Sequence, residues 1–311
     1  MYSTKLLFAA LIIIVTACQR EDSTNKPLPE NVQAISLVGD TLFTNLTQLP
    51  AKLESRIDSL IDVAEANNDD LATMMIWQAR KKGYQGEYRA AIDYLSDAIA
   101  SFPEDARLYR HRGHRYLTLR QLDLAIADFE KATTLIEGKE DIVEPDGLPN
   151  AQNKPTSTLQ SNIWYHLGLA YYLKGDYKNA QNSYENCLKV SLNNDMKVAT
   201  TYWYYMTLRK AGKDELAGKI LATIPMELDL IENTSYHKLL LVFKGEFDSE
   251  LLLAENSSAL DNATLGYGLG FWHSINGRTE RAHEIWQQVY DTNNWSPFGF
   301  IASEAELARM N

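Results

Sequence analysis

Apolar residues recur at helical spacing along most of the chain. The pattern begins near residue 51, and its first members, three or four residues apart on one helix face, are Leu53, Ile57, Leu60, Ile61 and Ala64. Comparable segments continue from there toward the C-terminal end of the sequence. The pattern predicts an all-α fold in which each helix buries one apolar stripe against its neighbours.

Two of these segments share one frame, 34 residues apart. Ala91 and Ala98 recur as Ala125 and Ala132, with large apolar residues at matching positions between them. Small residues let two helices approach closely, while the larger ones fill the space beside the contact. The period and the frame resemble the tetratricopeptide repeat, a helix-turn-helix unit. That resemblance implies a right-handed superhelix, or α-solenoid.

The frame divides residues 51–311 into six helical hairpins and a C-terminal capping helix. The hairpins are expected at 72–105, 106–138, 161–194, 198–227, 229–262 and 263–294. The third fits the repeat best, at Trp164, Leu167, Gly168, Tyr171, Gly175, Tyr177, Ala180 and Tyr184. Proline and glycine between the second and third hairpins predict an inserted loop over residues 139–160.

Residues 1–17 have the pattern of a secretory leader. Lys5 precedes an apolar stretch from Leu6 to Val15, which is too short to span a bilayer. The sequence Val15-Thr16-Ala17-Cys18 resembles the bacterial lipobox. The resemblance implies cleavage before Cys18 and attachment of acyl chains such as palmitate to that cysteine. An ordinary secretory signal with an incidental cysteine is the alternative.

Residues 18–50 are expected to form the lipidated cysteine and a flexible tether, because they are rich in Asn, Pro, Thr and Asp. The residue after Cys18 is not aspartate, which by analogy with the known sorting rule favours the outer membrane of the cell envelope. Gln19-Arg20-Glu21-Asp22 resembles a short signal that exports lipoproteins of some bacteria to the cell surface. A solvated charged linker is the alternative.

Three segments resemble a family of bacterial tetratricopeptide lipoproteins that has no established activity. They run from Arg110 to Tyr116, from Glu144 to Asn150 and from Pro297 to Leu307. The resemblance covers nearly the whole mature chain. It implies a fold and a location but no reaction.

The first helix of each repeat, helix A, is expected to line the concave face of the solenoid. The repeat frame places ten polar or aromatic residues there: Arg80, Arg107, Arg110, His114, Asn162, Tyr165, Tyr172, Tyr202, Arg209 and Lys210. Such a basic and aromatic groove suits a protein partner or an acidic peptide, because arginine pairs bidentately with carboxylates. Alternatively, these arginines pair with acids of the chain itself, including Asp146 of the inserted loop.

Composition argues against several other classes. The chain has 30 Lys and Arg against 41 Asp and Glu, so nucleic-acid binding, which depends on phosphate neutralisation, is not expected. No catalytic motif is present, and we expect neither an enzyme nor a cofactor. His111 and His114 share a helix face, but the arginines around them would repel a metal ion. Cys187 stands where the other repeats have alanine, which indicates packing rather than a reactive thiol.

Three functions are compatible with this chain. The leading interpretation is a membrane-anchored scaffold, or adaptor, of the cell envelope that binds protein partners through the groove. A glycan-binding or uptake accessory lipoprotein is the alternative, since starch-utilisation lipoproteins also combine tetratricopeptide helices with aromatic platforms. A hydrolase using Arg110, His114 and Asp146 is the third. The sequence leaves the oligomeric state open.

Overall fold

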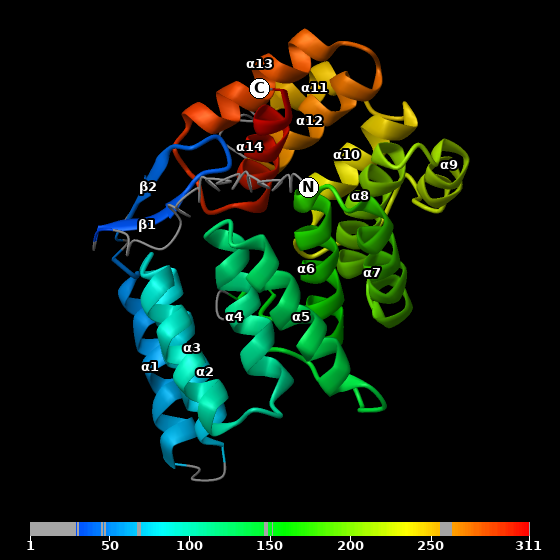
Figure 1. Cartoon of the computed structure of the whole chain (residues 1–311). Coiled ribbons are helices and arrows are strands. Elements are labelled where there is room, and N and C mark those ends of the chain that lie inside the picture. The colour runs from blue at the N-terminus through cyan, green and yellow to red at the C-terminus, as the bar shows by residue number, and fades with distance from the viewer. Residues whose placement is uncertain are drawn as a thin grey trace, which may run out of the picture.

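The computed structural model describes residues 29, 31–44, 46, 48–66, 70–145, 149–150, 152–255 and 263–310. These residues form fourteen α-helices and one two-stranded sheet (Figure 1). The helices are α1 (Ala51–Ala66), α2 (Leu71–Tyr84), α3 (Tyr88–Ser101), α4 (Ala106–Thr118), α5 (Leu122–Ile136), α6 (Leu159–Lys174), α7 (Tyr177–Val190), α8 (Asn194–Lys210), α9 (Asp214–Ala222), α10 (Thr234–Lys244), α11 (Ser249–Glu255), α12 (Ala263–Ile275), α13 (Thr279–Asp291) and α14 (Phe298–Met310). The predicted all-α solenoid is confirmed.

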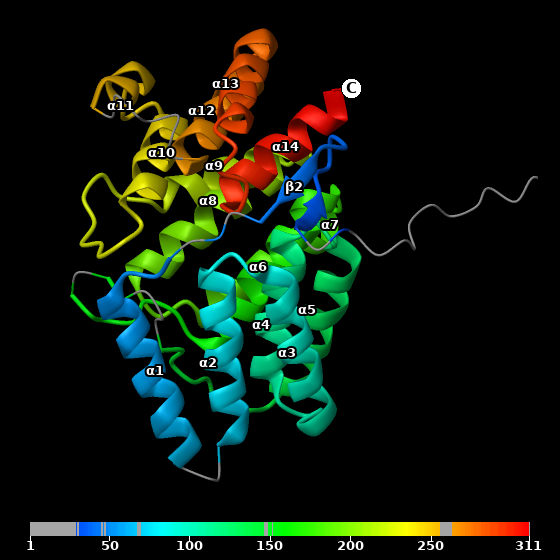
Figure 2. The same ribbon diagram turned by 90° about the vertical axis from the view of Figure 1, so that its left-hand side faces the viewer.

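Among the described residues, consecutive helices pack as hairpins in the pairs α2–α3, α4–α5, α6–α7, α8–α9 and α12–α13. The first helix of each pair is a helix A, and α10, which contacts α8 and α12, continues that row. Helix α1 precedes the array and packs on α2 through Ile57 and Trp77, both buried. Figure 2 shows the first helices standing side by side. The inserted loop lies between α5 and α6, where proline and glycine interrupt the helical pattern.

Small residues occur where the two helices of a hairpin touch. Ala91, Ala125 and Ala180 are fully buried at these contacts. Gly168 of α6 lies against the ring of Tyr184 on α7, so a Cβ added at Gly168 would stand 2.7 Å from the Tyr184 Cε1 atom. The repeat frame therefore places glycine and alanine where the fold has no room for larger side chains.

Cys187 of α7 occupies the position that Ala98 and Ala132 hold in the first two repeats, and it is also fully buried. Burial raises the pKa of its thiol to about 12, so the sulfur stays protonated at neutral pH. The interpretation of Cys187 as a packing residue is confirmed.

Helix α14 lies along the helix A side of the array and does more than close its end. Lys210 Nζ on α8 bonds the Glu306 carboxylate at 2.7 Å, and Arg309 Nη2 donates to the Leu173 carbonyl of α6 at 2.6 Å. At the start of α14, the ring centre of Phe298 lies 5.3 Å from that of His114 on α4. The last helix therefore fills much of the concave face that the sequence analysis treats as an open groove.

A β-hairpin forms where the sequence predicts only a tether. Strand β1 (Val32–Ile35) pairs antiparallel with β2 (Thr41–Phe43), and Gly39 supplies a left-handed backbone angle (φ 99°) between them. Val32, Ala34 and Leu42 are buried. These alternating apolar residues give the hairpin a face to pack, which explains why residues 32–43 fold.

The hairpin joins the two ends of the array. Arg89 on α3 donates to the Val32 carbonyl at 2.9 Å. At the other end, the Leu37 backbone N–H donates to the Glu304 carboxylate of α14, and Tyr290 of α13 donates to Asp40 at 2.6 Å. Figures 1 and 2 both show the hairpin beside α14.

Candidate functional site

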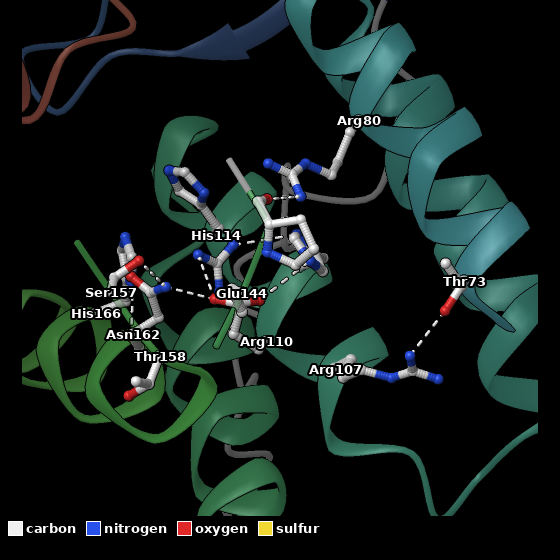
Figure 3. A network of polar contacts seen from close by, with 12 residues as sticks. Thr73, Arg80, Arg107, Arg110, His114, Glu144, Ser157, Thr158, Asn162 and His166 are labelled. Atoms are coloured by element: carbon white, nitrogen blue, oxygen red, sulfur yellow. Dashed lines mark hydrogen bonds and ion pairs between the residues drawn. The ribbon is translucent and has the colours of Figure 1, made fainter. Parts of the chain in front are cut away.

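Polar side chains gather where α2, α4 and α6 face the inserted loop. Figure 3 shows Arg80 from α2 and Arg110 with His114 from α4 around Glu144 of the loop, with Asn162 on the other side. Helix α4 supplies most of the charge, because its run Arg110-His111-Arg112-Gly113-His114-Arg115 places basic residues on several faces. Arg112 points away from the cluster, and its Nη2 atom lies 2.7 Å from Asp128 Oδ1.

The inserted loop delivers Glu144 into this cluster. An isolated bridge between Val143 and Thr158, with a 2.8 Å bond from the Leu159 N–H to the Ile142 carbonyl, holds the two arms of the loop together. The Glu144 side chain, 9% exposed, accepts Arg110 Nη2 at 3.0 Å and the Asn162 amide. Burial opposes its ionisation, but Arg110 and a bond from His111 outweigh burial and lower the pKa of Glu144 to about 2. The carboxylate is therefore charged at neutral pH.

Three histidines in the cluster stay neutral. Burial and, next, the nearby Arg110 lower the pKa of His111 and of His166 to about 3. Burial and Arg115 lower the pKa of His114 well below its usual value. Arg110 donates to His111 Nδ1 at 3.1 Å and Arg115 donates to His114 Nδ1 at 2.8 Å, which assigns the ring proton of both histidines to Nε2.

A cavity of about 120 Å³ opens between α2 and α4. Its polar lining consists of Arg80, Tyr84, Arg110, His111, His114 and Arg115. Arg80 donates to the Pro145 carbonyl at 2.9 Å and to the Tyr84 hydroxyl at 3.2 Å. Among the described residues, no carboxylate lies within ion-pair distance of Arg80 or Arg115. Burial, together with the neighbouring Arg110 and Arg80, lowers the pKa of Arg115 to about 10.

The other basic residues of the predicted groove are paired within the chain. Arg107 bonds Asp105 at 2.6 Å and Asp70 at 3.2 Å. Arg209 bonds Asp214 at 2.7 Å, and Lys210 bonds Glu306 of α14. The alternative of internally paired arginines therefore describes Arg107, Arg110 and Arg209. The partner of Arg110 is Glu144, while Asp146 lies outside the described residues.

The aromatic part of the predicted groove requires correction. Tyr165, Tyr172 and Tyr202 are 7%, 1% and 0% exposed, so in this structure they are packing residues and line no open surface. Tyr165 and Tyr202 lie against Tyr236 of α10, and Tyr172 bonds Tyr267 of α12. Asn162 is also buried, and its side-chain amide donates a hydrogen bond to Glu144. Of the ten predicted residues, Arg80, Arg110 and His114 line the cavity.

The sequence analysis missed three members of the cluster. Arg115 lies in the basic run of α4, and the density of arginine and histidine in that run could have indicated it. Glu144 was harder to find, because only the folding of the loop brings it to Arg110. Nothing in the sequence marks His166 of α6, whose ring centre lies 4.7 Å from that of His114 in the folded protein.

Cys18 and the lipobox lie outside the described residues. No helix in the described part of the chain is long and apolar enough to cross a membrane. Nor do His, Cys, Asp or Glu side chains of that part form a group of three or more that could hold a metal ion.

Comparison with known proteins identifies the repeats. Models of the tetratricopeptide repeat match residues 78–139 and residues 161–194. No curated protein matches the chain.

Several solved structures are similar to this chain, and two of them are described here. A structure of Naa15/Naa10 bound to HypK-THB is 17% identical, with a TM-score of 0.35, and the match covers 78% of this chain and 34% of that one. This chain therefore spans about a third of the length of that protein. YrrB, described as a TPR protein with an unusual peptide-binding site, is 19% identical, with a TM-score of 0.34 and coverage of 68% and 97%. The two family matches and the pairing of consecutive helices show that the chain carries tetratricopeptide repeats. Its fold is the solenoid that such repeats build.

Proposed function

We propose that the protein is a lipid-anchored scaffold of the cell envelope that binds an acidic segment of a protein partner. Tetratricopeptide repeats are typically protein-interaction modules and not catalytic ones, which supports the scaffold role. The anchoring part of the proposal depends on the lipobox-like sequence that ends at Cys18.

One observation carries the choice of an acidic segment. The helix A face already holds a carboxylate, that of Glu144, between Arg110 and Asn162. The residues Glu144-Pro145 contact three helices in an extended stretch of chain, since Arg80 of α2 also binds the Pro145 carbonyl. This intramolecular contact supports a partner segment that offers a carboxylate together with backbone carbonyls.

The open end of the concave face is the proposed binding surface. Helix α14 contacts α6 and α12, binds Lys210 of α8, and donates from Arg309 to the backbone carbonyls of Tyr172 and Leu173. Near α2 and α4 the face keeps partly exposed arginines, namely Arg80 and Arg115. A partner would therefore meet the first two repeats. Because Tyr165, Tyr172 and Tyr202 are buried, these three residues do not form the aromatic platform that the glycan-binding alternative requires.

The proposal is tested by partner capture from detergent-solubilised envelopes. Arg80→Glu combined with Arg115→Gln should reduce capture of the co-purifying proteins at least tenfold, because both changes remove positive charge from the open end. Lys178→Glu with Lys189→Glu is the control, since both lysines are exposed on α7 away from helix A. Capture should also fall with added salt.

The comparison of partner capture is valid only if the variants keep the wild-type melting temperature, because an unfolded variant would lose its partners for another reason. If the arginine variant then retains its full set of partners, the open end is not the binding surface. We avoid reversing Arg107 or Arg110, because each is paired with an acid and the reversal would destabilise the fold.

A further inference from the structure

We propose that the cavity between α2 and α4 binds one tetrahedral oxyanion of the phosphate class, either free phosphate or a phosphomonoester. The inference goes beyond the proposed function, because it uses some of the same arginines but requires no protein partner. It rests on four features of the cavity, which are its charge, the way its arginines are held, its unsatisfied donor and its size.

The charge of the described cluster is unbalanced. Three guanidinium groups, from Arg80, Arg110 and Arg115, face the cavity, and the single described carboxylate beside them is Glu144. The histidines of the lining are neutral. Two positive charges therefore remain in a partly enclosed space, where unbalanced charge costs more than in water. A doubly charged anion matches that excess.

Neutral groups hold the arginines in position. Arg80 is fixed by the Pro145 carbonyl and the Tyr84 hydroxyl, and it stacks 4.2 Å from the centre of the Trp77 ring. Arg115 donates to His114 Nδ1 and lies 5.6 Å from the centre of the Tyr88 ring. Such contacts order a guanidinium without neutralising it. The cluster is thus preorganised for an anion that approaches from the cavity.

A donor is left over inside the cluster. The Nε atom of Arg110 is buried and has no hydrogen-bond partner, although Nη1 and Nη2 of the same group bind His111 and Glu144. A buried N–H without an acceptor is unfavourable, so such groups mark places where an acceptor binds. An oxyanion supplies acceptors in several directions at once.

The cavity has the size of such an ion. Its volume of about 120 Å³ leaves room for several water molecules, since a cavity needs about 10–15 Å³ to hold one water molecule. Donors reach it from both α2 and α4, so they surround the space from different directions. A planar carboxylate accepts in one plane, as Glu144 does, whereas a tetrahedral ion can accept from both helices at once.

The test measures binding of sodium phosphate to the purified protein by calorimetry and by thermal melting. Ionic strength is held constant with sodium chloride, so that general screening is the same in every sample. Phosphate should bind and raise the melting temperature above that in the chloride control. Equal melting temperatures in phosphate and chloride would overturn the proposal.

Three single variants report on the cavity. Arg115→Gln and Arg80→Gln should each weaken phosphate binding at least tenfold, and Arg80→Gln keeps the test decisive if loss of Arg115 unfolds the protein. Lys189→Gln, an exposed change on α7, should bind like the wild type. Wild-type affinity in both arginine variants contradicts the assignment.

Glu144→Gln should change phosphate affinity in the opposite direction from the arginine variants. It removes the one described acid that competes for the guanidinium groups, so phosphate should bind several-fold more tightly. A purely structural role for the arginines would leave phosphate affinity unchanged or destroy it along with the fold. Unchanged or weaker phosphate binding in a folded Glu144→Gln protein therefore counts against the site.

Two further ligands define the chemistry. Sodium acetate should not replace phosphate, and equal binding of acetate would overturn the choice of a doubly charged ion. A short phosphoserine peptide then distinguishes the sources of the ion. Competition of the peptide with phosphate supports a phosphomonoester, while phosphate binding without peptide binding supports the free ion. Partner capture in phosphate-free buffer, measured separately, tests the proposed function alone.

Discussion

Arg120 and Glu304 form a buried ion pair across 184 positions of the sequence. The Arg120 Nη2 atom lies 2.6 Å from Glu304 Oε2, and the two side chains are 2% and 0% exposed. Arg120 lies in the turn after α4 and has a left-handed backbone angle (φ 61°). Arg120 Nη2 also donates to the Trp295 carbonyl at 2.9 Å.

Removing one member of this pair should be strongly destabilising. Arg120→Met leaves the Glu304 charge buried without its partner, so the free energy of unfolding should fall by about 3–5 kcal/mol in urea titrations. The double variant Arg120→Met with Glu304→Leu should recover most of that loss. A single variant as stable as the wild type would show that the pair is not closed in solution.

The close contact at Gly168 predicts a difference between two glycine-to-alanine changes. Gly168→Ala should destabilise the protein by about 1–3 kcal/mol, because the new methyl group meets the Tyr184 ring at 2.7 Å. Gly218→Ala in α9 has nothing within 4 Å and should stabilise the helix by about 0.5–1 kcal/mol. Thermal melts of both variants check the two signs. Equal effects would mean that α6 and α7 are not in this register.

Stability should fall as the pH drops from 7 toward 4. His111 and His166 have pKa values of about 3 in the folded protein, so between pH 3 and 6.5 the unfolded chain binds more protons than the folded one. Each histidine then lowers the free energy of unfolding by up to about 1.4 kcal/mol per pH unit. Glu144 acts in the same direction below its ordinary pKa, because its contribution is lost as the pH falls toward 2.

Urea titrations at several pH values measure this slope. His111→Gln should reduce it, whereas His283→Gln, at an exposed position of α13, should leave it unchanged. A slope that is the same in wild type and His111→Gln would mean that folding does not change the pKa of His111.

The anchor proposal makes a prediction about Cys18. Cys18→Ser should abolish labelling by a palmitate analogue and leave a full-length precursor or a released protein, because the thioether needs the thiol. Cys187→Ser is a matched control, since that thiol is buried in the fold and should not affect labelling. Unchanged label in Cys18→Ser would remove the lipoprotein interpretation.

Much of the solenoid could be predicted from sequence because its signals are local. Ala91, Ala125 and Ala180 each mark the contact between the two helices of their own hairpin. The glycine turns lie between the same two helices, so they are also close in the sequence. Such positions depend on neighbours less than 40 residues away, so the repeat frame carries them.

The contents of the concave face could not be predicted in the same way. Glu304 and Glu306 look like exposed helix positions in the sequence, yet they are buried because Arg120 and Lys210 from distant repeats reach them. Glu144 is likewise defined by a contact that the loop makes only after folding. Lys210 and Arg110, expected to meet a partner, instead pair with α14 and with the loop, because a charged side chain can bind a complementary segment of its own chain.

The β1–β2 hairpin changes how the array should respond to unfolding. An open repeat array behaves as a row of units, each coupled only to the next, so it can fray from either end. Here the strands fasten α3 at one end to α13 and α14 at the other, through Arg89, Tyr290 and Glu304. Neither terminal unit is free to peel away alone. Shortening the chain from either side should therefore loosen both ends together, and the molecule should melt as one closed body with a single sharp transition.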